Sequence, residues 1–217
     1  MSDSRRLAER LKTAKGRSTS QQNWLRRQLN DPYVGKAKDA GYRSRAAFKL
    51  IEIDAKVRLF RPGMKVVDLG AAPGGWTQVA IERKAGTIVA LDILEMDQLP
   101  GAVVLQADFL DPAASDKVKA ALNGPADLIL TDMAPSTTGH RETDHLRIVA
   151  LVEAAFEFAC DVLKPGGAFV GKLRQGGEEQ KLMKAVQGCF AKLQRIKPPS
   201  SRSESAEFYF AATGFKG

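Results

Sequence analysis

The sequence predicts a doubly wound α/β fold, in which helices cover both faces of a mostly parallel sheet. Short apolar runs alternate along the chain with longer amphipathic stretches, so crossover helices are expected to join successive strands. The apolar runs are unbroken, which is typical of strands that are buried on both faces. At 217 residues, the chain is long enough for one domain with a full core.

The individual elements follow from the spacing of apolar residues. Strands are expected at 65–70, 87–92, 102–108, 127–132, 167–173 and 207–214, with a further short strand possible at 193–197. Helices are expected at 44–59, from Gly74 onward, and at 115–123, 144–163 and 178–192. Pro-Gly pairs follow the first and fourth of these helices and are expected to end them.

The charge of the chain is unevenly distributed. The net charge is +8, of which residues 1–49 carry +9 and the remaining residues −1. We expect residues 1–30 to form a basic arm ahead of a domain that spans residues 31–217. A basic arm on a near-neutral body predicts a polyanionic partner, with nucleic acid as the first choice. A solvated tail that only aids solubility is the alternative.

Targeting signals and metal sites are not evident. No run of eighteen apolar residues occurs, and the N-terminus has no apolar segment typical of a secretory signal. The two cysteines are interpreted as apolar fillers in a reducing compartment, and no metal is expected. We therefore expect a cytoplasmic protein without membrane association. The mitochondrial matrix is the less favoured alternative, because Asp3 and Glu9 interrupt an otherwise Arg- and Ser-rich N-terminus.

A glycine-rich turn follows the first predicted strand. It reads DLGAAPGGW over residues 68–76 and opens a helix, where glycine lets the backbone approach a ligand. In open α/β sheets, nucleotides bind at this edge. The spacing is not that of the G-x-G-x-x-G fingerprint, which counts against a dinucleotide. A tight turn without a ligand is the structural alternative.

Two aspartates end the next two predicted strands. Asp92 lies 22 residues after Gly70, where an acid can accept both ribose hydroxyls of an adenosine. Asp108 ends the third strand and is placed to receive an adenine amino group. Either residue alone could be a helix N-cap. Together with the glycine-rich turn, they predict a nucleoside site.

Four further charged residues are expected to converge beside this nucleoside site. Asp132 and Lys172 end the fourth and fifth strands, and Glu207 begins the last strand. If the last strand runs antiparallel, its start lies at the same edge of the sheet. Lys49 belongs to the helix before the first strand and can lean over the crevice. The alternative for Lys172 and Glu207 is a surface ion pair of little consequence.

Five stretches of the chain resemble the FtsJ/RrmJ (RlmE) family, whose members are ribose 2′-O-methyltransferases of large-subunit ribosomal RNA that use S-adenosyl-L-methionine (AdoMet). The stretches are RSRAAFKL, VVDLGAAPGGW, DMAP, FVGKLRQG and SAEFYFAATG. The resemblance covers roughly residues 31–214 and keeps the family order. It implies a class I, Rossmann-like methyltransferase fold with a seven-stranded sheet, of which the last strand is antiparallel.

The resemblance also implies site residues and a substrate. The catalytic tetrad of the family falls on Lys49, Asp132, Lys172 and Glu207. Its AdoMet contacts fall on Gly74, Trp76, Asp92, Asp108 and Asp132. The implied acceptor is a uridine ribose in the A-loop of large-subunit rRNA, free or in the ribosomal subunit. Ser136 departs from the asparagine usual in the bacterial family.

The chemistry gives each member of the tetrad a role. Lys172 lies nearest the 2′-hydroxyl as a base or a positioner, and a base must be partly neutral. Burial and the cation of Lys49 favour the neutral amine, whereas the carboxylates of Asp132 and Glu207 oppose it. Asp132 holds Lys172 and borders the methionine part of AdoMet. Glu207 is the most dispensable member, and no metal is required.

Other functions remain open at this stage. The same tetrad serves 2′-O-methylation of transfer RNA or of an mRNA cap, and a non-catalytic RNA-binding assembly factor could keep this fold. An NAD-dependent oxidoreductase is third, because the glycine spacing disfavours it. We expect a monomer that contacts RNA through the basic arm, with Arg43 and Arg45 flanking the crevice.

Overall fold

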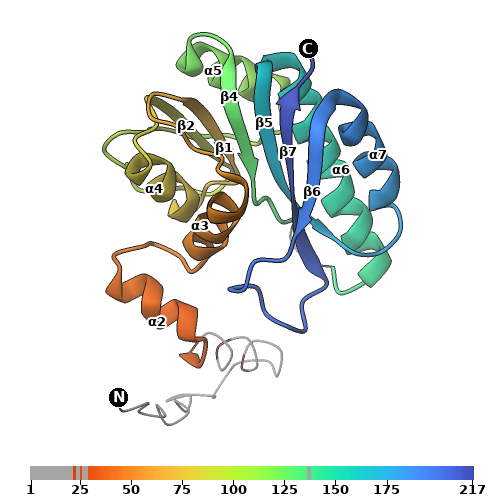
Figure 1. The fold of residues 1–217 in the computed structure, drawn as a ribbon. Coiled ribbons are helices and arrows are strands. Elements are labelled where there is room, and N and C mark those ends of the chain that lie inside the picture. The colour runs from red at the N-terminus through yellow and green to blue at the C-terminus, as the bar shows by residue number, and fades with distance from the viewer. Residues whose placement is uncertain (1–21, 23–24, 26–28, 136–137) are drawn as a thin grey trace.

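The structure, a computed structural model, describes residues 29–135 and 138–217, together with residues 22 and 25 (Figure 1). Most of the predicted basic arm and Ser136 therefore lie outside the described residues. The described chain forms one seven-stranded sheet with helices on both faces (Figure 1). The predicted α/β class is confirmed.

All six strands predicted without reservation are present, and so is the additional short one. The strands are β1 (Lys65–Leu69), β2 (Thr87–Asp92), β3 (Val103–Gln106), β4 (Ala126–Thr131), β5 (Leu163–Arg174), β6 (Phe190–Ile196) and β7 (Glu207–Phe215). The helices are α2 (Pro32–Asp39), α3 (Ala46–Val57), α4 (Gly75–Glu82), α5 (Pro112–Leu122), α6 (Arg141–Val162) and α7 (Glu179–Cys189).

The strand order is β3-β2-β1-β4-β5-β7-β6. Strands β1 to β5 pair in parallel, whereas β7 pairs antiparallel with both of its neighbours, β5 and β6. The order reverses between β1 and β4, and such a switch point opens a crevice at the carboxyl ends of the strands. Because β7 runs against β5, its first residues lie at this same edge.

Neighbouring side chains in strands such as β1, β2 and β7 enter two separate cores on opposite faces of the sheet. Helices α5, α6 and α7 pack on one face of the sheet, and α3 and α4 pack on the other. In β7, Phe208 and Phe210 enter the first core and Tyr209 enters the second. The alternation of side chains along a strand therefore decides which face of the sheet each residue of β7 serves.

Helix α2 is absent from the sequence prediction. Asp31 caps it by accepting the Tyr33 N–H at 3.1 Å, and Pro32 occupies its first turn. Both features are sequence signals of a helix start. Asp31 also forms ion pairs with Arg45 and Arg202, so it ties α2 to α3 and to the loop before β7.

The predicted turn after the fourth helix is wrong, although the helix itself ends at Val162, one residue before its predicted end. The segment 164–167, predicted to be a turn after that helix, belongs to β5, which begins at Leu163. A register shift between β4 and β5 in this region accommodates the Pro-Gly-Gly sequence. The prediction fails because Pro and Gly are typical both of a turn after a helix and of an irregular start of a strand.

A carboxyl group is buried beneath the glycine-rich turn. Asp68, in β1, has no solvent exposure, and the Thr77 hydroxyl donates to its Oδ2 at 2.7 Å. Among the described residues, its Oδ1 has no hydrogen-bond partner. Burial raises the pKa of Asp68 to about 7; the Thr77 hydrogen bond lowers it, and the nearby carboxylates of Asp132 and Asp92 raise it.

We expect Asp68→Asn to change how stability depends on pH. From about pH 4 to about pH 7, the native carboxyl keeps a proton that the unfolded chain has lost, so this contribution to stability falls as pH rises. The variant lacks this loss. Urea unfolding should show the variant gaining stability relative to wild type across this interval, by a few kcal/mol at most. A stability difference that stays constant with pH would contradict the assignment.

Candidate active site

A cavity of about 400 Å³ lies at the switch point between β1 and β4. Its lining comes from the residues that follow β1, β2, β3 and β4, which meet at the carboxyl edge of the sheet. The lining residues include Gly70, Asp92, Ile93, Leu94, Asp108, Phe109, Asp132 and Met133. The structure thus brings together three of the five residues predicted to bind AdoMet, namely Asp92, Asp108 and Asp132.

Gly70 makes the close approach of two strand ends possible. Its φ is +77°, and a Cβ atom at this position would lie 2.5 Å from Met133 Cγ and 2.9 Å from the Met133 backbone. Any other residue would push the end of β4 away from the end of β1. The glycine-rich turn therefore allows the loop with Asp132 and Met133 to lie against the cavity.

Backbone groups fix the orientation of two carboxylates in the cavity. Asp92 accepts the Ala72 N–H at 2.9 Å through Oδ2 and the Leu94 N–H at 2.8 Å through Oδ1. Asp108 accepts the Leu110 N–H at 3.0 Å. Each carboxylate oxygen can accept a second hydrogen bond. Both groups are thus held in place and keep the capacity to bind ligand hydroxyl or amino groups.

The other two predicted AdoMet contacts lie outside the lining of this cavity. Trp76 is 3% exposed, belongs to the core beneath α3 and α4, and donates its indole N–H to the Ala46 carbonyl at 2.8 Å. Gly74 precedes α4 with a φ of +111°, and a Cβ atom at this position would lie 2.9 Å from Leu99 Cδ1 and 3.1 Å from Met96 Sδ. In this structure, Trp76 packs in the core and Gly74 caps the start of α4. Their contact with AdoMet stays a prediction.

The Lys172–Asp132 pair joins the ends of β4 and β5. Lys172 Nζ lies 2.9 Å from Asp132 Oδ1 and donates to the Asp132 backbone carbonyl at 2.7 Å. Their side chains are 8% and 17% exposed. A nearly buried amine and a nearly buried carboxylate need each other, because either charge alone would be costly in this position.

Tyr209 connects this pair to Lys49 and was not anticipated from the sequence. Its hydroxyl donates to Asp132 Oδ1 at 2.8 Å and accepts from Lys49 Nζ at 3.0 Å. The ring is fully buried beside Trp76, so it looks like a core residue in the sequence. The signal that could have found it is its position two residues after Glu207, on the same face of β7.

The charges in this chain of contacts set the protonation states of Asp132 and Tyr209. Burial by itself raises the pKa of Asp132, but the charges of Lys172 and Lys49 and the two side-chain hydrogen bonds hold it below the ordinary value. Burial and the adjacent Asp132 raise the pKa of Tyr209 well above its usual range. At neutral pH, Asp132 is therefore ionised and the Tyr209 hydroxyl keeps its proton.

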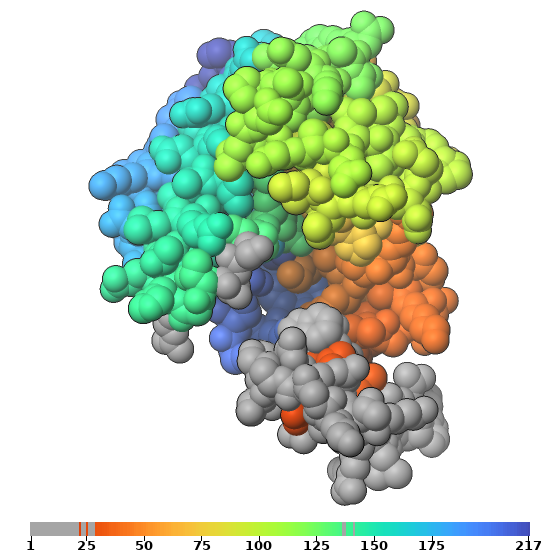
Figure 2. All heavy atoms as spheres, turned by 180° about the vertical axis from the view of Figure 1, so that it is seen from behind, coloured from red at the N-terminus to blue at the C-terminus, as the bar shows by residue number. Residues whose placement is uncertain are grey.

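A groove of about 560 Å³ continues from the cavity, because Ala134 and Pro135 line both. Figure 2 shows the hollow between the orange segment that includes α3 and the teal segment of α6. Its charged lining residues are Arg45, Lys49, Asp144, Arg174, Arg202, Glu204 and Glu207. Asp132, which holds Lys172, thus lines the cavity just before the loop residues that the cavity and the groove share.

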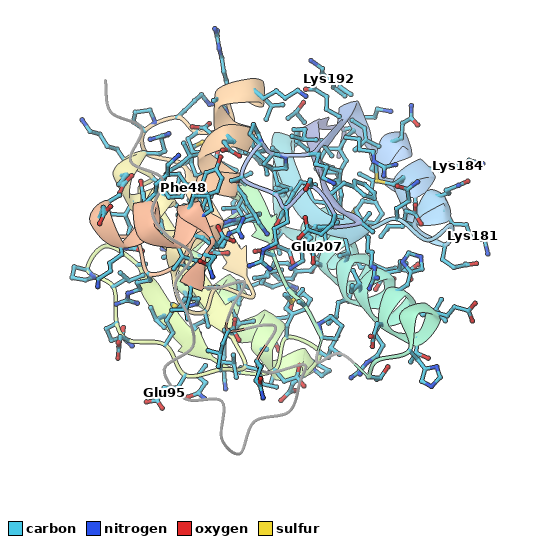
Figure 3. The ribbon with its side chains drawn as sticks, turned by 90° about the horizontal axis from the view of Figure 1, so that it is seen from below. Phe48, Glu95, Lys181, Lys184, Lys192 and Glu207 are labelled. Atoms are coloured by element: carbon cyan, nitrogen blue, oxygen red, sulfur yellow. The ribbon has the colours of Figure 1, made fainter. Side chains whose placement is uncertain are left out.

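Glu207 lies at the rim of the groove, near the centre of the view in Figure 3. It shares the groove with Lys49 and pairs with Arg174 in the β5–β7 register. Among the described residues, no salt bridge joins its carboxylate to either lysine of the predicted tetrad. The geometry therefore joins Lys49, Asp132 and Lys172 through Tyr209, with Glu207 outside this chain of contacts.

The two arginines predicted to contact RNA are held by the protein. Arg43 donates to the backbone carbonyls of Pro73, Asp97 and Gln98 at 3.3, 2.8 and 3.1 Å. Arg45 is 15% exposed and binds Asp31 and the Ser200 carbonyl. Arg45 lines the groove, whereas Arg43 holds the loop that follows β2. Contact of either with RNA stays a prediction.

Metal-binding clusters and membrane-spanning helices are both absent from the described residues. Within the described residues, no group of three or more His, Cys, Asp or Glu side chains is arranged to hold a metal ion. In the same part of the chain, no helix has the length and apolar character needed to cross a membrane.

Comparison with known proteins agrees with this architecture. The sequence profile of the FtsJ-like methyltransferases matches residues 42–215. Similar proteins are the "Ribosomal RNA large subunit methyltransferase E" of Paramagnetospirillum magneticum, 56% identical over 99% of this chain and 91% of that protein, and its namesake from Azorhizobium caulinodans, 54% identical over 99% and 92%.

A solved structure described as a ribosomal RNA methyltransferase from Plasmodium falciparum superimposes with a TM-score of 0.74. It is 29% identical in sequence, and the match covers 81% of this chain and 100% of that one. The sequence profile covers most of the chain, and the relatives align over nearly its full length. The chain therefore belongs to the FtsJ-like methyltransferase family and has its Rossmann-like methyltransferase fold.

Proposed function

We propose that the chain transfers a methyl group from AdoMet to the 2′-hydroxyl of a uridine ribose in the A-loop of large-subunit ribosomal RNA. The observation that carries the proposal is the nearly buried Lys172–Asp132 pair. Its carboxylate lines a cavity that can hold a nucleoside, and the loop residues that follow, Ala134 and Pro135, line both this cavity and the groove. The names of the relatives support ribosomal RNA as the acceptor. The family resemblance alone supports the uridine and the A-loop.

The residues of the cavity fit AdoMet. Asp92 and Asp108 supply oriented carboxylate oxygens for the ribose hydroxyls and the adenine amino group, and Ile93, Leu94 and Phe109 supply apolar contacts. When bound, AdoMet supplies a sulfonium methyl group that needs no further activation. Asp132 and Met133 lie at the end of the cavity nearest the groove, where the methionine part would be held.

Lys172 is the group we assign to the acceptor hydroxyl. An ammonium group has three N–H donors, and Asp132 receives two of them, through Oδ1 and the backbone carbonyl. These two bonds fix the direction of Nζ, so the remaining position can orient the hydroxyl oxygen. Alignment of reacting groups is worth up to roughly 7–11 kcal/mol in the best intramolecular cases. Lys172 thus positions the hydroxyl, and its neutral form can also accept the proton.

Lys49 and Tyr209 act on this arrangement indirectly. The positive charge of Lys49 helps to keep Asp132 ionised, and the Tyr209 hydroxyl donates to the same carboxylate oxygen that Lys172 contacts. We assign both as positioning residues. Glu207, at the rim, is the most dispensable of the residues predicted from the sequence.

Rival acceptors differ in what the groove must bind. A transfer RNA or an mRNA cap would use the same catalytic pair, and a non-catalytic assembly factor would need no such pair at all. The relatives favour large-subunit rRNA, free or within the subunit. We further propose that the basic arm and Arg45 contact this RNA, that Arg43 acts by holding the cofactor loop, and that the protein works as a monomer in the cytoplasm.

The proposal is tested by transfer of tritiated methyl groups from AdoMet to undermethylated large ribosomal subunits, free large-subunit rRNA, transfer RNA and capped mRNA. We expect label in large-subunit rRNA, and nuclease digestion should release it as 2′-O-methyluridine from the A-loop. Strong labelling of transfer RNA or cap with none in large-subunit rRNA would overturn the acceptor. The absence of label in every RNA, with AdoMet bound, would favour the assembly factor.

Replacement of Lys172 by arginine separates its two roles. Arginine keeps the positive charge and can hold Asp132, but it cannot give up its proton at any workable pH. If Lys172 removes the proton, methyl transfer by Lys172→Arg should fall by at least about a hundredfold. Calorimetry should show near wild-type AdoMet affinity. Turnover close to wild type would eliminate the base and leave only the positioning role.

A further inference from the structure

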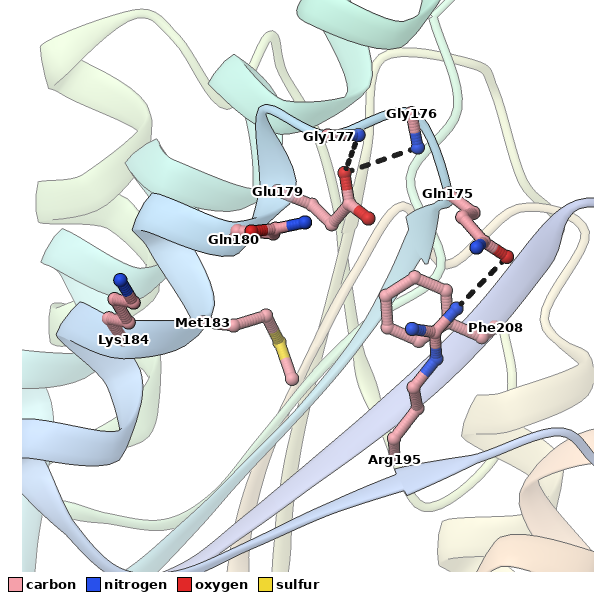
Figure 4. A pocket seen from close by; sticks show the side chains of 9 residues that line it. All are labelled: Gln175, Gly176, Gly177, Glu179, Gln180, Met183, Lys184, Arg195 and Phe208. Carbon is pink, nitrogen blue, oxygen red and sulfur yellow. Dashed lines mark hydrogen bonds between the residues drawn. The ribbon is translucent and has the colours of Figure 1, made fainter.

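A second hollow lies on the other face of the strands that carry the catalytic pair. This α7 pocket has a volume of about 510 Å³ and lies between α7 and the strands β6 and β7 (Figure 4). The lining residues used below are Gln175, Gln180, Met183, Lys184, Arg195 and Phe208. None of them takes part in the function proposed above.

Neighbouring residues at the end of β5 and at the start of β7 line the groove and the α7 pocket. Arg174 and Glu207, which pair in the β5–β7 register, line the groove. The residues that follow them in the chain are Gln175, directly after β5, and Phe208, in β7, and both line the α7 pocket. Because successive side chains of a strand point to opposite faces, Phe208 faces the α7 pocket and Tyr209 faces the catalytic pair. The end of β5 and the start of β7 therefore form a ridge, which an RNA strand in the groove would cross to reach the α7 pocket.

The surface around the α7 pocket is basic. Residues 174–197 contain six Lys and Arg against two Glu, a net charge of +4, whereas residues 50–173 have a net charge of −5. Along the sequence, the near-neutral body thus contains an acidic segment followed by a basic segment. Lys181 and Lys184 project outward from α7 (Figure 3), and Lys192 is an exposed residue of the edge strand β6. Charge complementarity therefore favours a polyanion at this surface.

The acidic residue of the α7 pocket does not oppose a polyanion strongly. Glu179 is 5% exposed, and its Oε2 accepts the backbone N–H groups of Gly176 and Gly177 (Figure 4). His145 Nε2 lies 3.5 Å from the same oxygen. The carboxylate is therefore turned into the loop that it stabilises.

The floor of the α7 pocket offers a flat surface for stacking. The guanidinium of Arg195 lies over the Phe208 ring, with its Cζ 3.6 Å from the ring centroid, and Nη2 donates to Gln175 Oε1 at 3.4 Å (Figure 4). Arg195 is exposed, whereas Phe208 is buried. Unpaired RNA bases stack on arginine planes and hydrogen-bond along their edges. The amide of Gln175 lies beside this plane, and Gln180 lines the α7 side of the same pocket (Figure 4).

We propose that the α7 pocket binds an unpaired nucleotide of the substrate RNA, outside the nucleotide that is methylated. The base stacks on the outer face of the Arg195 guanidinium, and Gln175 and Gln180 contact the base edge. Lys184 and Arg174 bind the flanking phosphates, so that the RNA crosses the ridge between the groove and the α7 pocket. The inference rests on the proposed function in that it takes the same RNA as ligand.

The test compares three variants in steady-state methylation of undermethylated large subunits. Lys184→Glu should raise KM about tenfold and reduce the salt dependence of binding, with kcat and AdoMet affinity unchanged. Lys117→Glu reverses an exposed lysine of α5, which packs on β1 and β2 and not on β6 or β7, and should leave KM within about twofold of wild type. Arg195→Lys keeps the charge, loses the stacking plane and should raise KM about fivefold.

Several outcomes would overturn the α7 pocket as an RNA site while the proposed function stands. One is an active wild-type enzyme for which Lys184→Glu and Lys117→Glu give the same KM. Another is Arg195→Lys with a wild-type KM, which removes the stacked base. A photoreactive amino acid at Gln180 should cross-link to rRNA on the subunit, and cross-linking to a ribosomal protein instead would contradict the inference. Failure of the proposed function would differ, because wild type itself would label no RNA.

Discussion

The carboxylate of Asp132 is the group on which the site depends. It receives Lys172 directly and Lys49 through the Tyr209 hydroxyl, so β4, β5, β7 and α3 each contribute one member to a single chain of contacts. Two lysines close to each other repel, and a nearly buried carboxylate is costly alone. Together they are mutually compensated, and the sheet order that places β7 beside β5 is what brings them together.

The same edge of the sheet positions all three hollows. The antiparallel strand β7 presents Glu207 toward the groove, Tyr209 toward the Lys172–Asp132 pair, and Phe208 toward the α7 pocket. Gly70 lets the end of β4 approach the end of β1, so Asp132 lines the cavity and the loop residues that follow, Ala134 and Pro135, line both the cavity and the groove. A few residues at one edge of the sheet therefore line the cavity, the groove and the α7 pocket.

The sequence could predict the strand ends, because parallel strands bring their carboxyl ends to one edge whatever lies between them. Asp92, Asp108, Asp132 and Lys172 were placed in this way. Tyr209 was missed because a buried aromatic ring in a strand gives no sign that its hydroxyl is used. The partners of Arg43 and Arg45 could not be predicted either, since they are backbone carbonyls and an aspartate supplied by distant loops and by the cap of α2.

The measurement that tests this account most directly is the single-turnover rate of methyl transfer by Asp132→Asn, with saturating AdoMet and large subunits. Asparagine keeps the shape but removes the charge that holds both lysines, so we expect the rate to fall by at least about a hundredfold while subunit binding is retained. Tyr209→Phe, which keeps Lys172 on Asp132 but cuts the link to Lys49, should lose less. A rate for Asp132→Asn within a few fold of wild type would contradict the central role of this carboxylate.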